Sequence, residues 1–430
     1  MTQRLLFLSL LLSAGVLHAD GISRGPYLQM PSPDSMTVCW QTDEPSDSVV
    51  RYGTQPDDLS KVGSNDDARL EHEVRLTGLA ASTTYYYAVG GSSGSPTCKF
   101  KTAPTPGSTS PVRVWVLGDS GTAGTGKGDA EKVRDAYRNS SFFKTPDLWL
   151  MLGDNAYPNG SEEETTRAIF NTYPETLKTS PLWSTFGNHD TYTDRGAPYF
   201  KAFRFPTKGE CGGLPSGTEH YYSFDYANIH FICLDSEGDR RSGSPMFEWL
   251  EADLASTSQT WIIAFWHLPP YSKGSHDSDK ENALGEMRRN ALPILEQHGA
   301  DLVLSGHSHS YERSMFIDGH YGVSSEFDVS TMAVDQGFGR PQEKGSKGAY
   351  KKQPGAHNGT VYVVGGNSGK ISGGKLNHPV MKVSENRLGS IILDIKGNRL
   401  DFKEIGTDGE AFDSFSLFKD ERAAPRSTKK

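Results

Sequence analysis

The sequence lacks an excess of positive charge. It contains 44 lysines and arginines against 53 aspartates and glutamates, which gives a formal net charge of −9. This balance argues against a protein that binds nucleic acid through a basic surface. Disorder throughout the chain is also excluded, because hydrophobic residues make up 35% of the sequence and can build a packed core.

Long hydrophobic runs are absent apart from one at the amino terminus. Arg4 precedes an apolar run over residues 5–12, and Ala19 follows a few residues later. This pattern is typical of a secretory signal peptide, here residues 1–19, and predicts a secreted, extracellular or periplasmic protein. A membrane anchor is the alternative, but the run is shorter than the roughly 20 residues that a spanning helix needs. We therefore expect no membrane span in the mature chain.

Cysteine is scarce, with four residues in the chain. None of them has the C-x-x-C spacing of thiolate metal sites, which argues against metal binding by cysteine. An even number of cysteines in an exported chain is typical of disulfides. Of the three pairings that four cysteines allow, we expect Cys39 with Cys98 and Cys211 with Cys233, because each pair lies within one region of the chain. Four free buried thiols are the alternative.

A chain of 430 residues is too long for one ordinary core and predicts two or three domains. Residues 21–103 contain short alternating strand patterns separated by Gly, Pro, Asn and Asp, which predicts an all-β module. Leu79, Tyr85 and Tyr87 resemble the tyrosine-corner region of fibronectin type III domains, so we expect a small immunoglobulin-like or fibronectin III-like sandwich. Residues 104–111, rich in Pro, Ser and Thr, are a predicted linker.

Strand and helix patterns alternate after the linker. Buried-strand runs are predicted at residues 112–117, 148–152, 261–266 and 302–304, and helices at 129–143 and 283–298. This alternation predicts a layered α/β domain over residues 112–418. Three further strand patterns follow one another at 360–364, 390–395 and 399–405. Residues 419–430 are predicted to be a polar C-terminal tail.

Polar side chains follow five predicted strands at the point where each strand ends, namely the four buried runs above and a further run at residues 182–186. These side chains are Asp119, Asp154 with Tyr157, Asn188 with His189, His267, and His307 with His309. Ligands of α/β sheets gather at the carboxyl ends of strands. Most of these residues stand close to a glycine, which lets the backbone turn sharply. One such motif alone is a common turn, but five in this order predict a shared site.

The residue types in these motifs indicate metal binding. Carboxylate, phenol, amide and imidazole ligands without thiolates suit iron, zinc or manganese. Seven such side chains, all of the set above except His189, are more than one four-coordinate zinc needs. They suit two metals that share a carboxylate, which is the usual arrangement for displacement at phosphorus.

The motifs resemble those of the purple acid phosphatases, within the calcineurin-like metallophosphoesterases. Residues 25–29 (GPYLQ) resemble the opening of that family, and residues 306–313 (GHSHSYER) are close to its closing motif. Tyr157 indicates the purple subgroup, since most members of the wider superfamily lack a tyrosine there. The resemblance covers the whole mature chain and implies a four-layer α/β/β/α sandwich preceded by the small β-sandwich.

The resemblance also implies a role for each ligand. Fe(III) would be held by Asp119, Asp154, Tyr157 and His309. A divalent Fe, Zn or Mn ion would be held by Asp154, Asn188, His267 and His307, with Asp154 bridging the two metals. His189 resembles a residue that contacts phosphate, and His276 resembles a second catalytic helper. Some relatives have two adjacent histidines where this chain has His276 and Asp277.

We therefore predict a secreted acid phosphatase that hydrolyses phosphate monoesters by attack of a metal-activated hydroxide. Its expected partners are small phosphate esters, with no specific nucleic-acid partner, and the sequence leaves the oligomeric state open. A phosphodiesterase or nucleotide hydrolase with the same ligands is one alternative, because the surrounding loops decide between them. A non-enzymatic surface-binding protein is another, although intact ligands at every motif argue against it.

The polar segment over residues 324–357 is predicted to be a loop, and the sequence leaves open whether it lines the site. Asp335 and Arg340 in this segment, together with His378 beyond it, are candidate substrate contacts.

Overall fold

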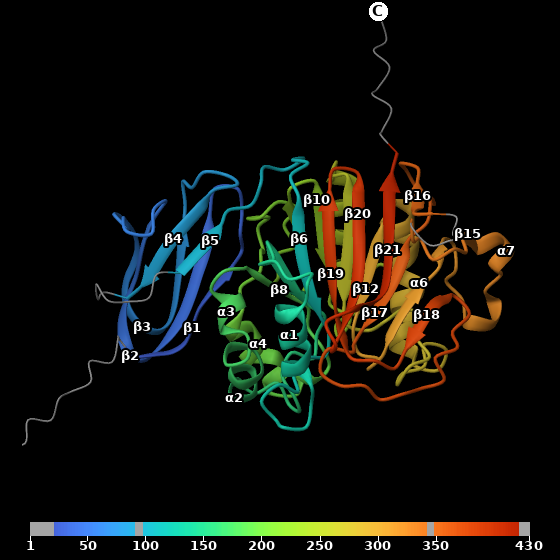
Figure 1. Cartoon of the computed structure of the whole chain (residues 1–430), viewed down its shortest axis with the longest axis horizontal. Coiled ribbons are helices and arrows are strands. Elements are labelled where there is room, and N and C mark those ends of the chain that lie inside the picture. Colours follow the sequence, from blue (N-terminus) through green and yellow to red (C-terminus); the bar gives the residue numbers. More distant parts are fainter. Residues whose placement is uncertain (1–20, 91–97, 342–347, 421–430) are drawn as a thin grey trace, which may run out of the picture.

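A computed structural model describes residues 21–90, 98–341 and 348–420. The predicted signal peptide, residues 1–19, lies outside the described residues, as does most of the predicted tail. The described chain forms an all-β domain followed by a larger α/β domain (Figure 1). Within the described ranges, no helix is both long enough and apolar enough to cross a membrane.

The first domain is a five-stranded sheet in the order β1-β2-β4-β5, with β3 paired to β2. Its strands are β1 (Ile22–Gln29), β2 (Met36–Gly53), β3 (Lys61–Leu76), β4 (Thr84–Val89) and β5 (Cys98–Lys101). Alternate residues of these strands, such as Val38, Trp40, Tyr85 and Tyr87, pack into one buried cluster. The tyrosine-corner prediction agrees with a contact here, because the Tyr85 hydroxyl accepts a hydrogen bond from the backbone N–H of Ala80 at 2.9 Å.

The second domain contains two seven-stranded sheets. In order, the first sheet consists of β16 (Tyr350–Lys352), β21 (Ala411–Lys419), β20 (Arg399–Gly406), β19 (Gly389–Lys396), β6 (Val112–Leu117), β7 (Leu148–Met151) and β8 (Leu182–Ser184). The second consists of β18 (Met381–Glu385), β13 (Tyr311–Ser314), β17 (Val361–Gly365), β12 (Leu302–Ser305), β11 (Trp261–Trp266), β10 (Ile229–Cys233) and β9 (Tyr222–Tyr226). A short pair, β14 (Phe316–Ile317) and β15 (Ala333–Asp335), lies apart from both.

The described residues of this domain form seven α-helices. They are α1 (Ala130–Asn139), α2 (Glu162–Thr165), α3 (Pro174–Leu177), α4 (Ala197–Ala202), α5 (Pro245–Ser256), α6 (Asn282–Gln297) and α7 (Val329–Met332). Strand β11 shows the layering, because Ile262, Ala264 and Trp266 pack with α5 and α6 while Ile263 and Phe265 join the core between the sheets. On the other side, Tyr137 of α1 stacks on Trp115 of β6. The predicted four-layer α/β/β/α architecture is therefore confirmed.

The two domains are packed against each other. The hydroxyl of Tyr27 on β1 donates to the carbonyl of Ala202 at 2.7 Å, and the ring of Tyr27 contacts Phe170 with centroids 4.8 Å apart. Arg204 of the second domain forms an ion pair with Glu73 of β3 at 2.8 Å. Apolar and charged contacts therefore both hold the all-β domain in place.

The predicted disulfides are wrong, because no disulfide bond joins any of the four cysteines, all of which the structure describes. Strand register explains the result for the second pair. The backbone of Cys211 bonds to Asp225, whereas Cys233 lies opposite Tyr222, three residues along the same strand. Three residues of strand span about 10 Å, which is too far for a disulfide.

Register also separates the first predicted pair. Cys39 lies in the half of β2 that pairs with Tyr27 of β1, whereas Cys98 of β5 pairs with Tyr87 of β4. Tyr87 is in turn opposite Tyr52, at the far end of β2. The even number of cysteines and their proximity in sequence carried no information about this geometry.

Candidate metal centre

The predicted ligands meet where loops leave the carboxyl ends of five strands. Strands β6, β7 and β8 run parallel in one sheet, and β11 and β12 run parallel in the other. Asp119, Asp154 and Asn188 follow the first three strands, and His267 and His307 follow the other two. Parallel strands end at the same edge, so two separate sheets deliver their polar loops to one place.

Two glycines allow the loops to approach so closely. Gly153 has a φ of 89°, and a Cβ on it would lie 2.4 Å from Nδ1 of His267. A Cβ on Gly306 would lie 2.5 Å from Oδ2 of Asp119. Asp119, Asp154 and His307 themselves adopt positive φ values, which is uncommon outside glycine and is concentrated at functional sites.

Four side chains gather on one side of the cluster. The hydroxyl of Tyr157 donates to Oδ2 of Asp154 at 2.8 Å and to Oδ1 of Asp119 at 3.2 Å. Nε2 of His309 lies 3.1 Å from the same hydroxyl and 3.5 Å from Oδ1 of Asp119. These are the four residues that the sequence assigned to the ferric ion.

Three other side chains gather on the opposite side of Asp154. Nε2 of His267 lies 3.2 Å from Oδ1 of Asn188, 3.2 Å from Nδ1 of His307 and 3.4 Å from Oδ1 of Asp154. Asp154 therefore presents one carboxylate oxygen to each half of the cluster. This arrangement suits the bridging position that the sequence assigned to it.

The hydrogen bonds of His267 and Asn188 leave two atoms that can bind a cation. Nδ1 of His267 donates to the carbonyl of Leu152 at 2.8 Å, which leaves a lone pair on Nε2. The side-chain nitrogen of Asn188 donates to the hydroxyl of Tyr192 at 3.1 Å, so its oxygen is the atom that faces the cluster. When His267 is neutral, both atoms are acceptors, and a metal ion that both of them bind relieves their contact, as a proton on Nε2 does in the absence of metal. Asp119, Asp154 and His267 also form one of the groups whose ligand atoms all lie within 4.8 Å.

Burial and charge shift the pKa values of the cluster strongly. Burial, together with Asp119 and Asp154, holds the pKa of Tyr157 well above its ordinary value. Burial opposes protonation of His267, but the same two carboxylates outweigh it and raise its pKa to about 9. Without a cation, the site therefore favours protons at the positions where metal ligands must be deprotonated.

The two predicted catalytic histidines flank this cluster. Nδ1 of His189 lies 2.6 Å from the carbonyl of Pro158, and its ring contacts Tyr157 with centroids 4.4 Å apart. Its Nε2 lies 4.0 Å from Oδ2 of Asp154. The ring of His276 stacks on His307, with centroids 3.7 Å apart. The structure thus brings together all nine predicted side chains, the seven metal ligands and the two catalytic histidines.

Three acids at the site were not assigned a role from the sequence. Asp190 is buried and accepts hydrogen bonds from the backbone of Gly187 and Asn155, which shapes the loop that carries Asn188. Burial raises the pKa of Glu237 to about 7, and His267 is among the groups that act on it. Glu281 contacts His276. Asp190 directly follows the Asn-His motif, but the other two stand in no motif.

The candidate substrate contacts have other surroundings. Arg340 forms an ion pair with the buried Asp413 at 2.8 Å. His378 is buried and packs against Tyr271. Asp335 belongs to β15. The segment that was predicted as a loop therefore contains short helices and strands in its described parts. None of these contacts supports a role in binding substrate.

Comparison with known proteins agrees with this geometry. The model of the calcineurin-like phosphoesterases matches residues 112–311, and the model of the purple acid phosphatase N-terminal domain matches residues 24–102. In both regions the chain is similar to the purple acid phosphatases. Purple acid phosphatase 18 of Arabidopsis thaliana is 28% identical over 311 residues, which cover 67% of this chain and 65% of the relative. The chain thus spans slightly less than two thirds of that phosphatase.

Not every purple acid phosphatase that this chain resembles is named as active. A protein of Arabidopsis thaliana named probable inactive purple acid phosphatase 1 is 26% identical over 442 residues, which cover 90% of this chain and 68% of the relative. The solved structure of purple acid phosphatase PPD1 from yellow lupin (Lupinus luteus) seeds has a TM-score of 0.72 at 20% identity, over 92% of this chain and 75% of that one. This likeness establishes the fold alone.

Proposed function

We propose that this chain is a secreted acid phosphatase with two metals, which hydrolyses phosphate monoesters. The observation that carries the proposal is the pair of acceptors, Nε2 of His267 and Oδ1 of Asn188, that face each other 3.2 Å apart beside Asp154. A divalent ion bound by both atoms would take the place of the proton that Nε2 of His267 otherwise holds in this contact. A second cation fits the hard, anionic ligands around Tyr157.

The proposed metals differ between the two halves. Asp119, Asp154, Tyr157 and His309 would hold Fe(III), because a phenolate and two carboxylates are hard ligands. Asp154, Asn188, His267 and His307 would hold a divalent Fe, Zn or Mn ion. When bound, two metals lower the pKa of water and neutralise charge on a phosphate ester.

The protein contributes two histidines to the substrate side. Nδ1 of His189 is engaged by the carbonyl of Pro158, so Nε2 is the nitrogen left to contact phosphate or the leaving group. His276 is held beside His307 and offers a second donor. We assign His189 as the principal group that stabilises charge on the phosphate or protonates the leaving oxygen.

Hydrolysis of two esters tests the proposal. Metal-loaded protein is assayed with p-nitrophenyl phosphate and with bis(p-nitrophenyl) phosphate at about pH 5 and about pH 7. We expect faster turnover of the monoester, with the higher rate near pH 5, because an Fe(III) site would support nucleophile formation in acid. Preference for the diester would favour the phosphodiesterase alternative. No turnover of either ester would favour a surface-binding protein.

Export is a separate part of the proposal. It rests on the signal-peptide pattern of residues 1–19, which lie outside the described residues. Mass analysis of the amino terminus of the protein, expressed with its full leader in an exporting host, tests it. We expect cleavage after Ala19 and recovery outside the cytoplasm, and an intact leader on cytoplasmic protein would contradict export.

A further inference from the structure

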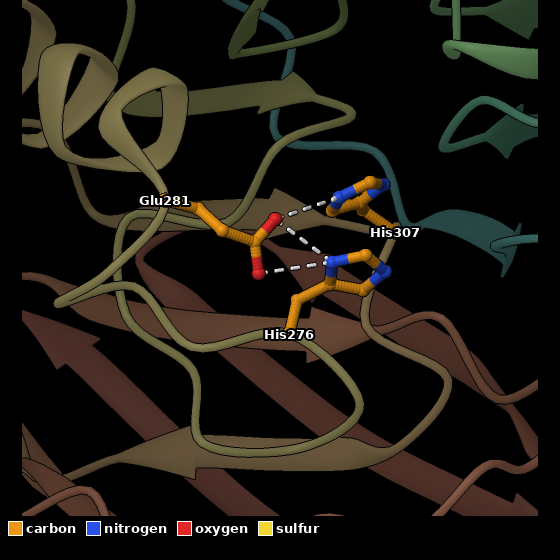
Figure 2. Close-up of side chains that lie close together, drawn as sticks. All are labelled: His276, Glu281 and His307. Atoms are coloured by element: carbon orange, nitrogen blue, oxygen red, sulfur yellow. Dashed lines mark hydrogen bonds and ion pairs between the residues drawn. The ribbon is translucent and has the colours of Figure 1, made fainter.

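Glu281 occupies a central position between two histidines of the site. It directly precedes α6, and its carboxylate points toward both His276 and His307 (Figure 2). Nδ1 of His276 lies 2.9 Å from Oε2 and 3.1 Å from Oε1 of Glu281. Nε2 of His307 lies 3.8 Å from Oε2. One carboxylate therefore faces both rings.

The carboxylate itself is held in place. The backbone N–H of Asp277 donates to Oε1 of Glu281 at 2.9 Å, in the same loop that carries His276. The rings of His276 and His307 stack with centroids 3.7 Å apart and planes inclined by 30°. A rotation of either ring would break this stack or its approach to Glu281. The two side chains therefore depend on one anchor.

The position of Glu281 also determines which nitrogen of each ring faces the site. Nδ1 of His307 faces Nε2 of His267 at 3.2 Å, so its Nε2 is the atom directed at Glu281. A proton on that Nε2 leaves a lone pair on Nδ1 for a metal. On His276 the nitrogen next to Glu281 is Nδ1, which leaves Nε2 for substrate.

We propose that Glu281 is a positioning residue that orients His276 toward substrate and sets the tautomer of His307 for the divalent metal. It acts through the two histidines. The proposed role of Glu281 toward substrate rests on the proposed function. Its role toward the divalent metal does not depend on turnover. Carboxylates behind metal-binding histidines typically change metal affinity or activity about 10- to 100-fold when removed.

Glu281→Gln is the principal test variant, and Glu286→Gln is its matched control. Glu286 lies on the same helix, but its carboxylate bonds to Arg240 and Asn282 rather than to site histidines. We measure Zn²⁺ affinity by competition with a chromogenic chelator, metal content per chain, and kcat and KM for p-nitrophenyl phosphate. For Glu281→Gln we expect Zn²⁺ affinity and kcat about 10- to 100-fold lower than in the control. Glu281→Asp should fall between wild type and Glu281→Gln.

A double variant separates positioning from general damage. In the background of His276→Ala, Glu281→Gln should lower kcat less than it does alone, while its effect on Zn²⁺ affinity through His307 should persist.

Equal affinity and kcat in Glu281→Gln, Glu281→Asp and Glu286→Gln would overturn the inference. So would a third metal per chain that only the Glu281 variants lose, because His276, Glu281 and His307 would then be ligands of that ion. If wild type binds Zn²⁺ but does not turn over, the proposed function fails while the affinity comparison still decides the role of Glu281 toward His307.

Discussion

At the scale of single residues, the site is defined by carboxylate, phenol, amide and imidazole side chains that lie within contact of one another. His267 is the clearest case, because one nitrogen is committed to Leu152 and the other faces Asn188 and His307. The sequence predicted these ligands because each follows a strand end in a recognisable motif. It gave no sign of Glu281, which lies in a polar loop far along the chain from His307 and resembles any surface acid.

A prediction at this scale concerns the space beside His267. Gly153→Ala should displace His267, since its Cβ would lie 2.4 Å from Nδ1. Gly126→Ala is the control, because Gly126 also has a positive φ, 67°, but a Cβ there meets nothing within 4 Å. We expect the control to lose about 1 kcal/mol of stability from backbone strain alone and to keep its metals. Gly153→Ala should bind Zn²⁺ at least about 10-fold more weakly in chelator competition.

A second prediction concerns the role of His189. His189→Ala should lower kcat for p-nitrophenyl phosphate on the order of 100-fold, the usual contribution of a positioned acid or base. Metal content should not change, since His189 is not among the predicted ligands. His298→Ala serves as the control, because His298 pairs with Glu251 instead of a site residue. A loss of metal in His189→Ala, or equal kcat in the two variants, would contradict the assigned role.

At the scale of elements, the fully buried strands were the easiest to predict. Residues 112–117 and 261–266 were predicted as strands with the bounds of β6 and β11, since both are continuous apolar runs. The hairpin of β9 and β10 was not predicted, because Asp225 and His230 interrupt its apolar pattern. These two residues are opposite each other in the hairpin, and only the tertiary structure satisfies them.

His230 also leads to a prediction about pH. It lies 2.8 Å from Asp225 and 2.7 Å from Asp253 of α5, so it joins the hairpin to a helix. Burial opposes its protonation, but hydrogen bonds to the two carboxylates outweigh burial and raise its pKa to about 9. The ordinary histidine pKa is about 6.5. The paired imidazolium therefore stabilises the fold fully below about pH 6.5, and this contribution is lost as the pH rises through about 9.

Chemical unfolding of wild type and His230→Gln at about pH 6 and about pH 9.5 measures this contribution. Between the two pH values, wild type should lose roughly 3 kcal/mol more of its free energy of unfolding than the variant. The comparison with the variant removes the titration of other groups, which both proteins share. An equal loss in both proteins would show that His230 does not titrate as described.

At the scale of the whole molecule, the all-β domain shares its core with the α/β domain. Tyr27, Met30 and Cys39 belong to the same buried cluster as the strands between the two sheets. We therefore expect one cooperative thermal transition by calorimetry. Tyr27→Ala should remove this coupling and cost about 3–5 kcal/mol, as for other large buried aromatic residues. Two separate transitions in wild type would contradict a shared core.

The central claim is a two-metal site with a tyrosinate on iron, and metal analysis combined with a visible spectrum tests it most directly. We expect about two metals per chain, one of them iron, with a broad visible band that disappears in Tyr157→Phe. Zinc alone with no colour, or a band that survives in Tyr157→Phe, would contradict it.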